Sequence, residues 1–338
     1  MFRAFRDSLI SFLRSDSPAV AVPPRWFVSD IRQWSATHEW RITARRLAPD
    51  EQVAVMARLG HAVFDEDLGN YRTALEFNTQ TVGGLGGPRA RRELLREHCA
   101  FLFVSLLDAL VLSDDRARAE AFENVEVVGY QHAEAALNTG RGAILLGCLQ
   151  THTGFGLRHP RLAQWKVTMV RPASAGDAYA PHWAEDSYGE TVDFAPISPE
   201  GLARLLARLK VNGCVAVQNE FLYPQTVGLS GMLLGRPALV SRSLVKLILR
   251  TRAPVLPVNV VRLQPFSSRK ICVEIHPPLP FDDLAECRLD RESAALRLSV
   301  ATECLIRRYP MQWTHWTALA QRWQEAQSMG PSPRPIDH

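Results

Sequence analysis

From residue 121 onward, short apolar runs alternate with stretches of helical periodicity. The runs are rich in Val, Ile, Leu and Cys, and they cover residues 125–128, 143–148, 167–170, 214–217, 255–261 and 271–275. Continuous apolar runs are typical of strands that are buried on both faces, because half-exposed strands alternate instead. Strands separated by helices form sheets with helices packed on both sides. The pattern therefore predicts an α/β fold with a mixed, largely parallel sheet flanked by helices.

The other segments divide the chain into four parts. We expect an amphipathic segment over 1–24, a helical region over 25–120, the α/β domain over 121–327 and a disordered, proline-rich tail over 328–338. Pro49, followed by two acidic residues, marks a helix start, because acidic side chains stabilise the first helical turn. The glycine-rich stretch 82–88 has no phosphate-binding motif, so we interpret it as a hinge.

Three further helices follow from spacing and caps. The segment 89–112 is basic at first and then almost wholly apolar, 241–252 ends before Pro254, and a C-terminal helix is predicted over 291–326. Trp313, Trp316 and Trp323 recur at helical spacings, which favours packing rather than a ligand cage.

Composition excludes several function classes. The formal net charge of +4, from 39 basic and 35 acidic residues, is too small to indicate a nucleic-acid partner. None of the six cysteines forms a CxxC pair, so we expect no metal site, and no motif for an organic cofactor is present. Cys148, Cys214 and Cys272 lie inside apolar runs and are predicted to be buried, reduced thiols of a cytoplasmic protein.

The first 14 residues have the pattern of an amphipathic helix. Phe2, Phe5, Leu9, Phe12 and Leu13 share one face, and arginines lie elsewhere. Such a helix either lies in a membrane interface, here on the inner face, or docks on the protein's own surface. No apolar run approaches the roughly 20 residues of a membrane-spanning helix.

Four stretches between residues 75 and 323 carry recognisable motifs. They are Arg91-Arg92 through His98; 127–132 with 140–146; Gly235-Arg-Pro-Ala238 with Arg252-Ala-Pro-Val-Leu-Pro-Val258; and Ile306-Arg-Arg-Tyr-Pro-Met-Gln-Trp313 with Arg322-Trp323. In this order they resemble the lipid A biosynthesis acyltransferases, within the wider glycerolipid and lysophospholipid acyltransferase superfamily. The resemblance implies transfer of a fatty acyl group from acyl carrier protein or coenzyme A to a hydroxyl or amine.

The family motif is a histidine followed after four residues by Asp or Glu. The histidine takes a proton from the acceptor, and the carboxylate orients the imidazole. An ungapped alignment places Leu149 and Gly154 at these two positions, so the motif is degenerate in this chain. His61 and Glu66 have the same spacing, but they precede the predicted sheet and we interpret the match as chance.

Three interpretations of the degenerate motif remain open. His152, three residues beyond the expected position, can be a displaced general base, oriented by Glu220 at the end of another predicted strand. Alternatively, the site works by positioning the reactants alone. In the third interpretation the chain is an inactive relative that binds an acyl chain or a carrier protein.

Other candidate site residues surround this turn. We expect Thr151 to line a cavity for the thioester, because ligands collect beyond the carboxyl ends of parallel strands. Arg171, which resembles the family's Arg-Pro position, and Arg236 are candidates for binding a phosphopantetheine or lipid phosphate, or are surface arginines. Cys148 is either a thiol nucleophile or, because it lies inside a strand, a buried inert thiol.

Overall fold

The computed structural model describes residues 48–111, 115–148, 150, 156–157, 159–171, 193–196, 198–219, 228–267, 270–284 and 287–328. The predicted amphipathic segment at the N-terminus and nearly all of the predicted C-terminal tail lie outside these residues.

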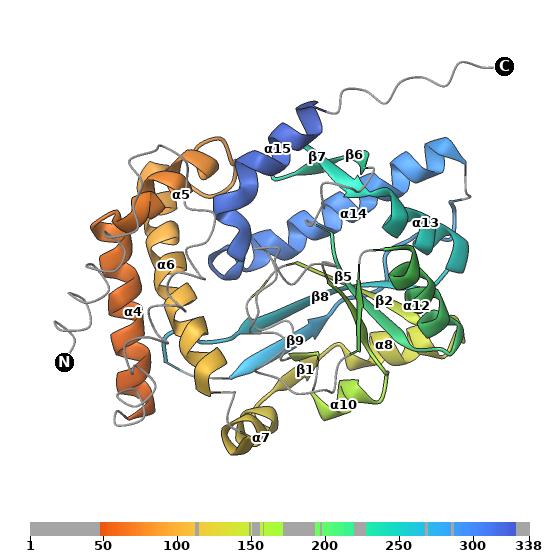
Figure 1. Ribbon diagram of the computed structural model, residues 1–338, viewed down its shortest axis with the longest axis horizontal. Helices are drawn as coiled ribbons and strands as arrows, with labels where there is room; N and C mark the ends of the chain where they lie inside the picture. Colours follow the sequence, from red (N-terminus) through yellow and green to blue (C-terminus); the bar gives the residue numbers. More distant parts are fainter. Residues whose placement is uncertain are drawn as a thin grey trace.

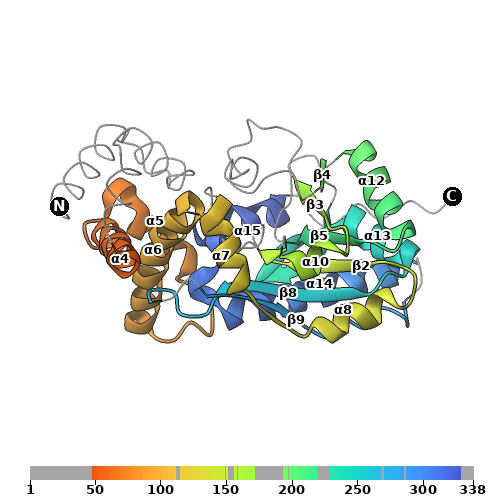
Figure 2. The same ribbon diagram turned by 90° about the horizontal axis from the view of Figure 1, so that it is seen from below.

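Seven strands of the described part form one sheet in the order β1-β9-β8-β2-β5-β3-β4 (Figure 1; β3 and β4 are labelled in Figure 2). They are β1 (Glu126–Val128), β2 (Ala143–Gly147), β3 (Thr168–Arg171), β4 (Asp193–Pro196), β5 (Cys214–Gln218), β8 (Val255–Arg262) and β9 (Ile271–Ile275). The strands from β8 to β4 are parallel, whereas β9 runs antiparallel to β8 and parallel to β1. This confirms the predicted mixed, largely parallel sheet, and each of the six apolar runs forms one of its strands.

Helices cover both faces of the sheet. Leu145 points toward α8 (Tyr130–Leu137) and α10 (Pro160–Ala163), because it shares a core cluster with their apolar side chains. Its neighbours Ile144 and Leu146 point to the opposite face, as expected for successive strand residues. The helices on that face are α12 (Pro199–Lys210), α13 (Arg242–Thr251) and α14 (Arg288–Arg308).

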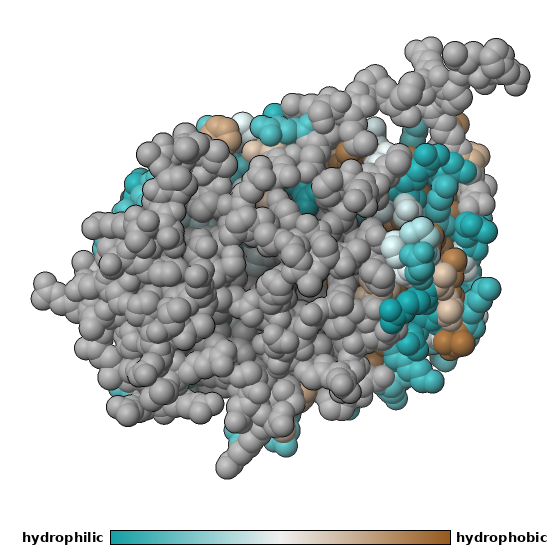
Figure 3. All heavy atoms as spheres, in the orientation of Figure 1, coloured by the Kyte–Doolittle hydropathy of each residue, from teal (hydrophilic) through white to brown (hydrophobic). Residues whose placement is uncertain are grey.

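The helix α13 shows why these segments fold against the sheet. Its Leu244, Val245 and Ile248 are buried, whereas Lys246 and Arg250 are exposed. Hydrophilic side chains accordingly dominate the described surface at the right of Figure 3, where Figure 1 places α12 and α13. An apolar stripe at helical spacing therefore determines which face is buried.

A separate helical layer lies at one end of the sheet (Figure 2). It contains α4 (Pro49–Asp65), η1 (Leu68–Asn70), α5 (Tyr71–Thr79) and α6 (Pro88–Val111), and α7 (Asp115–Glu123) follows. The layer shares one apolar core with the C-terminal elements η2 (Pro310–Gln312), η3 (Thr314–Ala318) and α15 (Leu319–Ser328). Trp313, Trp316 and Trp323 are buried in this core, which confirms their predicted packing role.

Polar contacts join the same two ends of the chain. The Asn78 side chain donates to Thr317 O at 3.0 Å and accepts from Ala320 N at 2.9 Å. The imidazole of His98 in α6 lies 2.8 Å from Met311 O. Helices α5 and α6 are therefore joined to the C-terminal elements η2, η3 and α15.

The single C-terminal helix predicted over 291–326 is wrong. The helix α14 ends at Arg308, and Tyr309 has φ −136° and ψ 60°, outside the helical region. Tyr309 precedes Pro310, whose ring disfavours helical geometry at the residue before it. Two short 3-10 helices then lead into α15, so that the tryptophans turn into the core instead of following one helical face.

A two-stranded hairpin, β6 (Gly228–Leu233) and β7 (Arg236–Ser241), was not predicted. Its strands are joined by Leu234 and Gly235, which have φ values of 51° and 83°. Positive φ at both central residues is typical of the tight type I′ turn. The hairpin packs on α14, where Ser299 Oγ accepts a 3.1 Å hydrogen bond from Met232 N.

Candidate active site

The carboxyl ends of three parallel strands, β2, β5 and β3, lie next to one another in the sheet. Gly147, the last residue of β2, is paired with Gln218 of β5 on one side and Val258 of β8 on the other. The chain leaves β2 toward β3, which lies beyond β5, whereas β8 lies on the opposite side of β2. Such a reversal of strand order opens a crevice at the carboxyl ends and is the common ligand site of α/β sheets.

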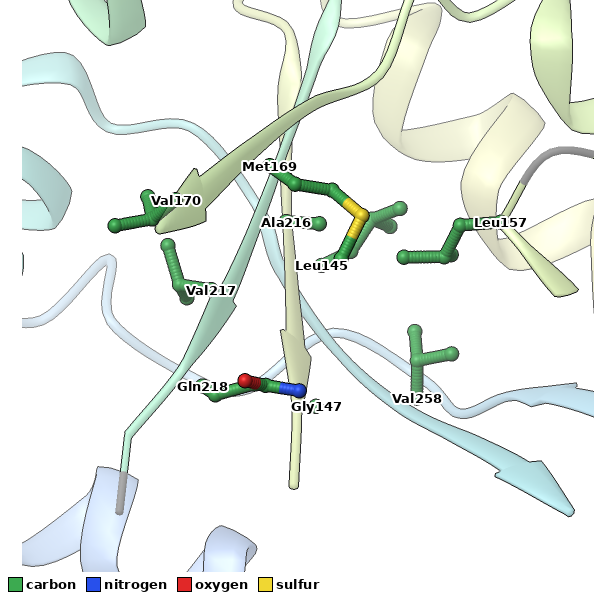
Figure 4. A pocket seen from close by; sticks show the side chains of 9 residues that line it. All are labelled: Leu145, Gly147, Leu157, Met169, Val170, Ala216, Val217, Gln218 and Val258. Atoms are coloured by element: carbon green, nitrogen blue, oxygen red, sulfur yellow. The ribbon is translucent and has the colours of Figure 1, made fainter. Parts of the chain in front are cut away.

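A mainly apolar pocket lies on the α8 side of these strand ends (Figure 4). The pocket is small: its cavity volume is about 10 Å³, roughly the space of one water molecule, and the described lining residues are Leu145, Gly147, Leu157, Met169, Val170, Ala216, Val217, Gln218 and Val258. In Figure 4 the Gln218 carboxamide extends toward Gly147. It is the one polar side chain among these residues, so the described lining at these strand ends is mainly apolar with one hydrogen-bonding group.

Buried carboxamides occupy the other side of the same strand ends. Gln150 donates from Nε2 to Asn259 Oδ1 at 3.0 Å, and its Oε1 accepts from Val260 N at 2.9 Å. The Sγ of Cys148 lies 3.9 Å from the same Asn259 oxygen. Gln150 is 2 % exposed and Asn259 is fully buried, and no described residue accepts a hydrogen bond from Asn259 Nδ2.

The end of β5 is fixed in a similar way. Asn219 follows β5 directly and donates from Nδ2 to Thr302 Oγ1 of α14 at 3.2 Å. Its Oδ1 is buried, and none of the described residues donates a hydrogen bond to it. Two neighbouring strands therefore end in buried carboxamides that attach them to the surrounding structure.

A model of the bacterial lipid A biosynthesis acyltransferases matches residues 88–325 of the chain. The chain belongs to this family. A comparison with curated proteins returned no match. The matched region runs from α6 into α15, so it includes the whole sheet, the pocket and the carboxamides. Membership places the chain among acyltransferases of lipid biosynthesis.

The structure describes two of the predicted site residues, Arg171 and Arg236, but not the other three. Thr151, His152 and Glu220 lie outside the described residues. Gln150 precedes His152 by two positions, and Asn219 directly precedes Glu220. Each of these two predicted residues therefore follows a strand end that a buried carboxamide attaches to its surroundings. Arg171 ends β3, beside the pocket-lining Val170.

Arg236 lies elsewhere. It belongs to β7, and its guanidinium lies 4.5 Å above the ring of Trp323. Its Nη1 is 3.4 Å from Thr81 Oγ1. Arg236 is not among the described residues that line the pocket.

His61 and three cysteines that the sequence brought to attention either form an ion pair or are buried. The Nε2 of His61 lies 2.9 Å from Glu97 Oε1 of α6, so its carboxylate partner is not Glu66. Cys148, Cys214 and Cys272 are buried as predicted. Burial raises the pKa of the Cys214 thiol to about 12 and that of the Cys272 thiol to about 11, which leaves both unreactive.

Sequence reasoning missed Gln150, Asn219 and Asn259. One signal was present, since Asn259 interrupts the apolar run 255–261 and a buried polar group requires a partner. No described helix is both long and apolar enough to cross a membrane. Within the described part of the chain, no group of His, Cys, Asp or Glu side chains is arranged to hold a metal ion.

Proposed function

We propose that the protein transfers an acyl group from an acyl thioester, carried by acyl carrier protein or coenzyme A, to a hydroxyl or amine acceptor in lipid or specialised-metabolite biosynthesis. The observation that carries this proposal is the mainly apolar edge formed by the adjacent carboxyl ends of β2, β3 and β5, with its small pocket. It lies within the region matched by the acyltransferase family and beside the strand end that leads to His152.

In this proposal His152 is the general base and Glu220 orients it. The acceptor oxygen or nitrogen attacks the thioester carbonyl carbon while the imidazole takes its proton. The tetrahedral intermediate then expels the thiolate, which receives that proton, and an ester or amide is formed. A carboxylate beside the imidazole stabilises its charged form and holds the required tautomer.

Chain connectivity supports this pairing. His152 is two residues from the clamped Gln150, and Glu220 is one residue from the clamped Asn219. Consecutive Cα atoms are about 3.8 Å apart, so both residues stay close to adjacent strand ends. Thr151 would lie at the substrate, and Arg171, at the end of β3, would bind the phosphate of the donor.

The second candidate function is that of an inactive relative that binds an acyl chain or carrier protein. Leu149 and Gly154, at the positions of the family's histidine and acid, favour this alternative. In both cases we propose a cytoplasmic protein, with residues 1–14 available to bind the inner face of the membrane.

The test uses the full-length protein with lauroyl, myristoyl and palmitoyl thioesters of both coenzyme A and acyl carrier protein, with a lipid extract as acceptor. Mass spectrometry measures the released carrier thiol and any acylated product. Loss of a general base typically lowers the rate by about 10²- to 10⁴-fold, so His152→Ala should have such an effect. The matched control is His159→Ala, which removes the imidazole that caps α10 and should change the rate less than about threefold.

Equal rates for His152→Ala and the unmodified protein would exclude His152 as the base. If no thioester is consumed, but native mass spectrometry shows a retained acyl chain or carrier protein, the inactive relative is the correct interpretation.

A further inference from the structure

The end of β2 is held by a side chain rather than by continued strand pairing. The ladder between β2 and β8 ends at Gly147 and Val258. Three residues after Gly147, the Gln150 side chain accepts a hydrogen bond from the backbone N–H of Val260 in β8. The backbone of Gln150 also forms an isolated antiparallel bridge with Trp313.

The Gln150 contacts are strong because no water competes with them. Gln150 is 2 % exposed and Asn259 is fully buried. The Gln150 carboxamide donates to the Asn259 side chain and accepts from the backbone of Val260 in β8. Both hydrogen bonds, at 2.9 and 3.0 Å, have the usual length for N–H···O contacts. A buried carboxamide that loses its partner is destabilised, so the pair favours one arrangement of the chain at residue 150.

We propose that Gln150 and Asn259 form an amide clamp that fixes the direction in which the chain leaves β2, and that Gln150 is thereby a positioning residue for acyl transfer. The inference rests on the proposed function, because the clamped residue is two positions from His152. Its physical basis is that a catalytic group displaced by about 1 Å can lose on the order of 10²-fold in rate.

A matched control contacts the same strand from η2. Gln312 is also buried, at 3 % exposure, and its carboxamide also binds the backbone of β8. Its Oε1 accepts from Arg262 N at 2.9 Å and its Nε2 donates to Arg262 O at 2.8 Å. Gln150→Met and Gln312→Met therefore remove the same kind of side-chain hydrogen bonds, but only the first releases the end of β2.

The first measurement is steady-state kinetics of both variants. Gln150→Met should lower kcat about 10- to 100-fold with KM changed less than about threefold, because the substrate pocket is intact. Gln312→Met should change kcat less than about threefold at a comparable loss of thermal stability. Equal losses of kcat in the two variants would show that Gln150 is only structural and would overturn the proposal.

A double variant tests whether the two carboxamides act as one unit. Gln150→Met combined with Asn259→Leu should lower kcat no further than the more severe single variant, since either change opens the clamp. Losses that multiply would contradict a shared clamp.

Hydrogen exchange provides a readout that does not depend on activity. Amides in the peptide 149–157 should exchange at least about tenfold faster in Gln150→Met than in Gln312→Met or the unmodified protein. Unchanged exchange would overturn the clamp even if the enzyme is active. Absence of acyl transfer in the unmodified protein, together with faster exchange in Gln150→Met, would instead refute the proposed function and retain the clamp.

Discussion

Replacing Asp108 by alanine should destabilise the protein by about 3–5 kcal/mol. Asp108 of α6 pairs with Arg262 at the end of β8, and this ion pair joins the helical layer to the sheet. The two side chains are only 3 % and 0 % exposed, respectively. The variant therefore removes the carboxylate that pairs with a fully buried guanidinium.

The size of the effect follows from this burial. Removing one partner of a buried ion pair costs about 3–5 kcal/mol, because the remaining charge is uncompensated, whereas an exposed pair contributes about 1 kcal/mol or less. A natural domain is stable by about 5–15 kcal/mol, so the expected loss is a large share of the total. The partly exposed pair of Glu303 and Arg307 on α14, at 2.8 Å and with side chains 24 % and 34 % exposed, provides the control in Glu303→Ala.

The assay is urea unfolding followed by tryptophan fluorescence, since Trp313 and Trp316 are buried beside the helical layer. Asp108→Ala should shift the midpoint far more than Glu303→Ala. The double variant Asp108→Leu/Arg262→Met should be more stable than Asp108→Ala, because it removes both charges of the pair together. Equal midpoints for Asp108→Ala and Glu303→Ala would refute the reasoning.

Two further predictions concern backbone strain and pH. Gly129→Ala should cost at least twice as much stability as Gly140→Ala in urea unfolding: both glycines have φ above +70°, but an added Cβ at Gly129 would lie 1.9 Å from Ile275 O, whereas at Gly140 it meets nothing within 4 Å. Equal losses of stability would show that the positive φ alone determines the effect, and not the contact with Ile275 O. Burial lowers the pKa of His98 to about 4, and burial with Arg322 lowers that of His315 to about 3. In the unfolded chain both imidazoles bind a proton below about pH 6.5, whereas in the folded protein they do so only near their lowered pKa values. The free energy of unfolding should therefore fall as pH decreases from 6.5 to 4, by about 3 kcal/mol for His98. Urea midpoints at pH 7 and 4.5 measure this, and an unchanged pH dependence in His98→Asn would contradict it.

The sheet could be predicted because its strands are buried on both faces. The run that became β2 is wholly apolar, and the runs that became β8 and β9 are mainly apolar, with Asn259 and Glu274 as their polar members. The strand β4 was missed because it has four residues and ends in a proline, which weakens any strand pattern. The β6–β7 hairpin was missed because Leu234, at a position that favours Asn or Asp, gave no turn signal.

The candidate site was only partly predictable. The sequence locates the end of β2 and the turn that follows it, because both depend on local pattern. The clamp joins Gln150 to Asn259, which is 109 residues away, and that contact exists only once the sheet has formed. Similarly, the stacking of Arg236 on Trp323 depends on the hairpin and on the break at Pro310.

The shared core of the two chain ends has a consequence during synthesis. Asn78 binds Thr317, which the ribosome adds 239 residues later. At about 5–20 residues per second, this interval is roughly 10–50 s. Throughout that time the apolar sides of α4, α5 and α6 lack the tryptophans that cover them in the finished molecule. The nascent chain is therefore a strong candidate for chaperone binding until its last helix emerges.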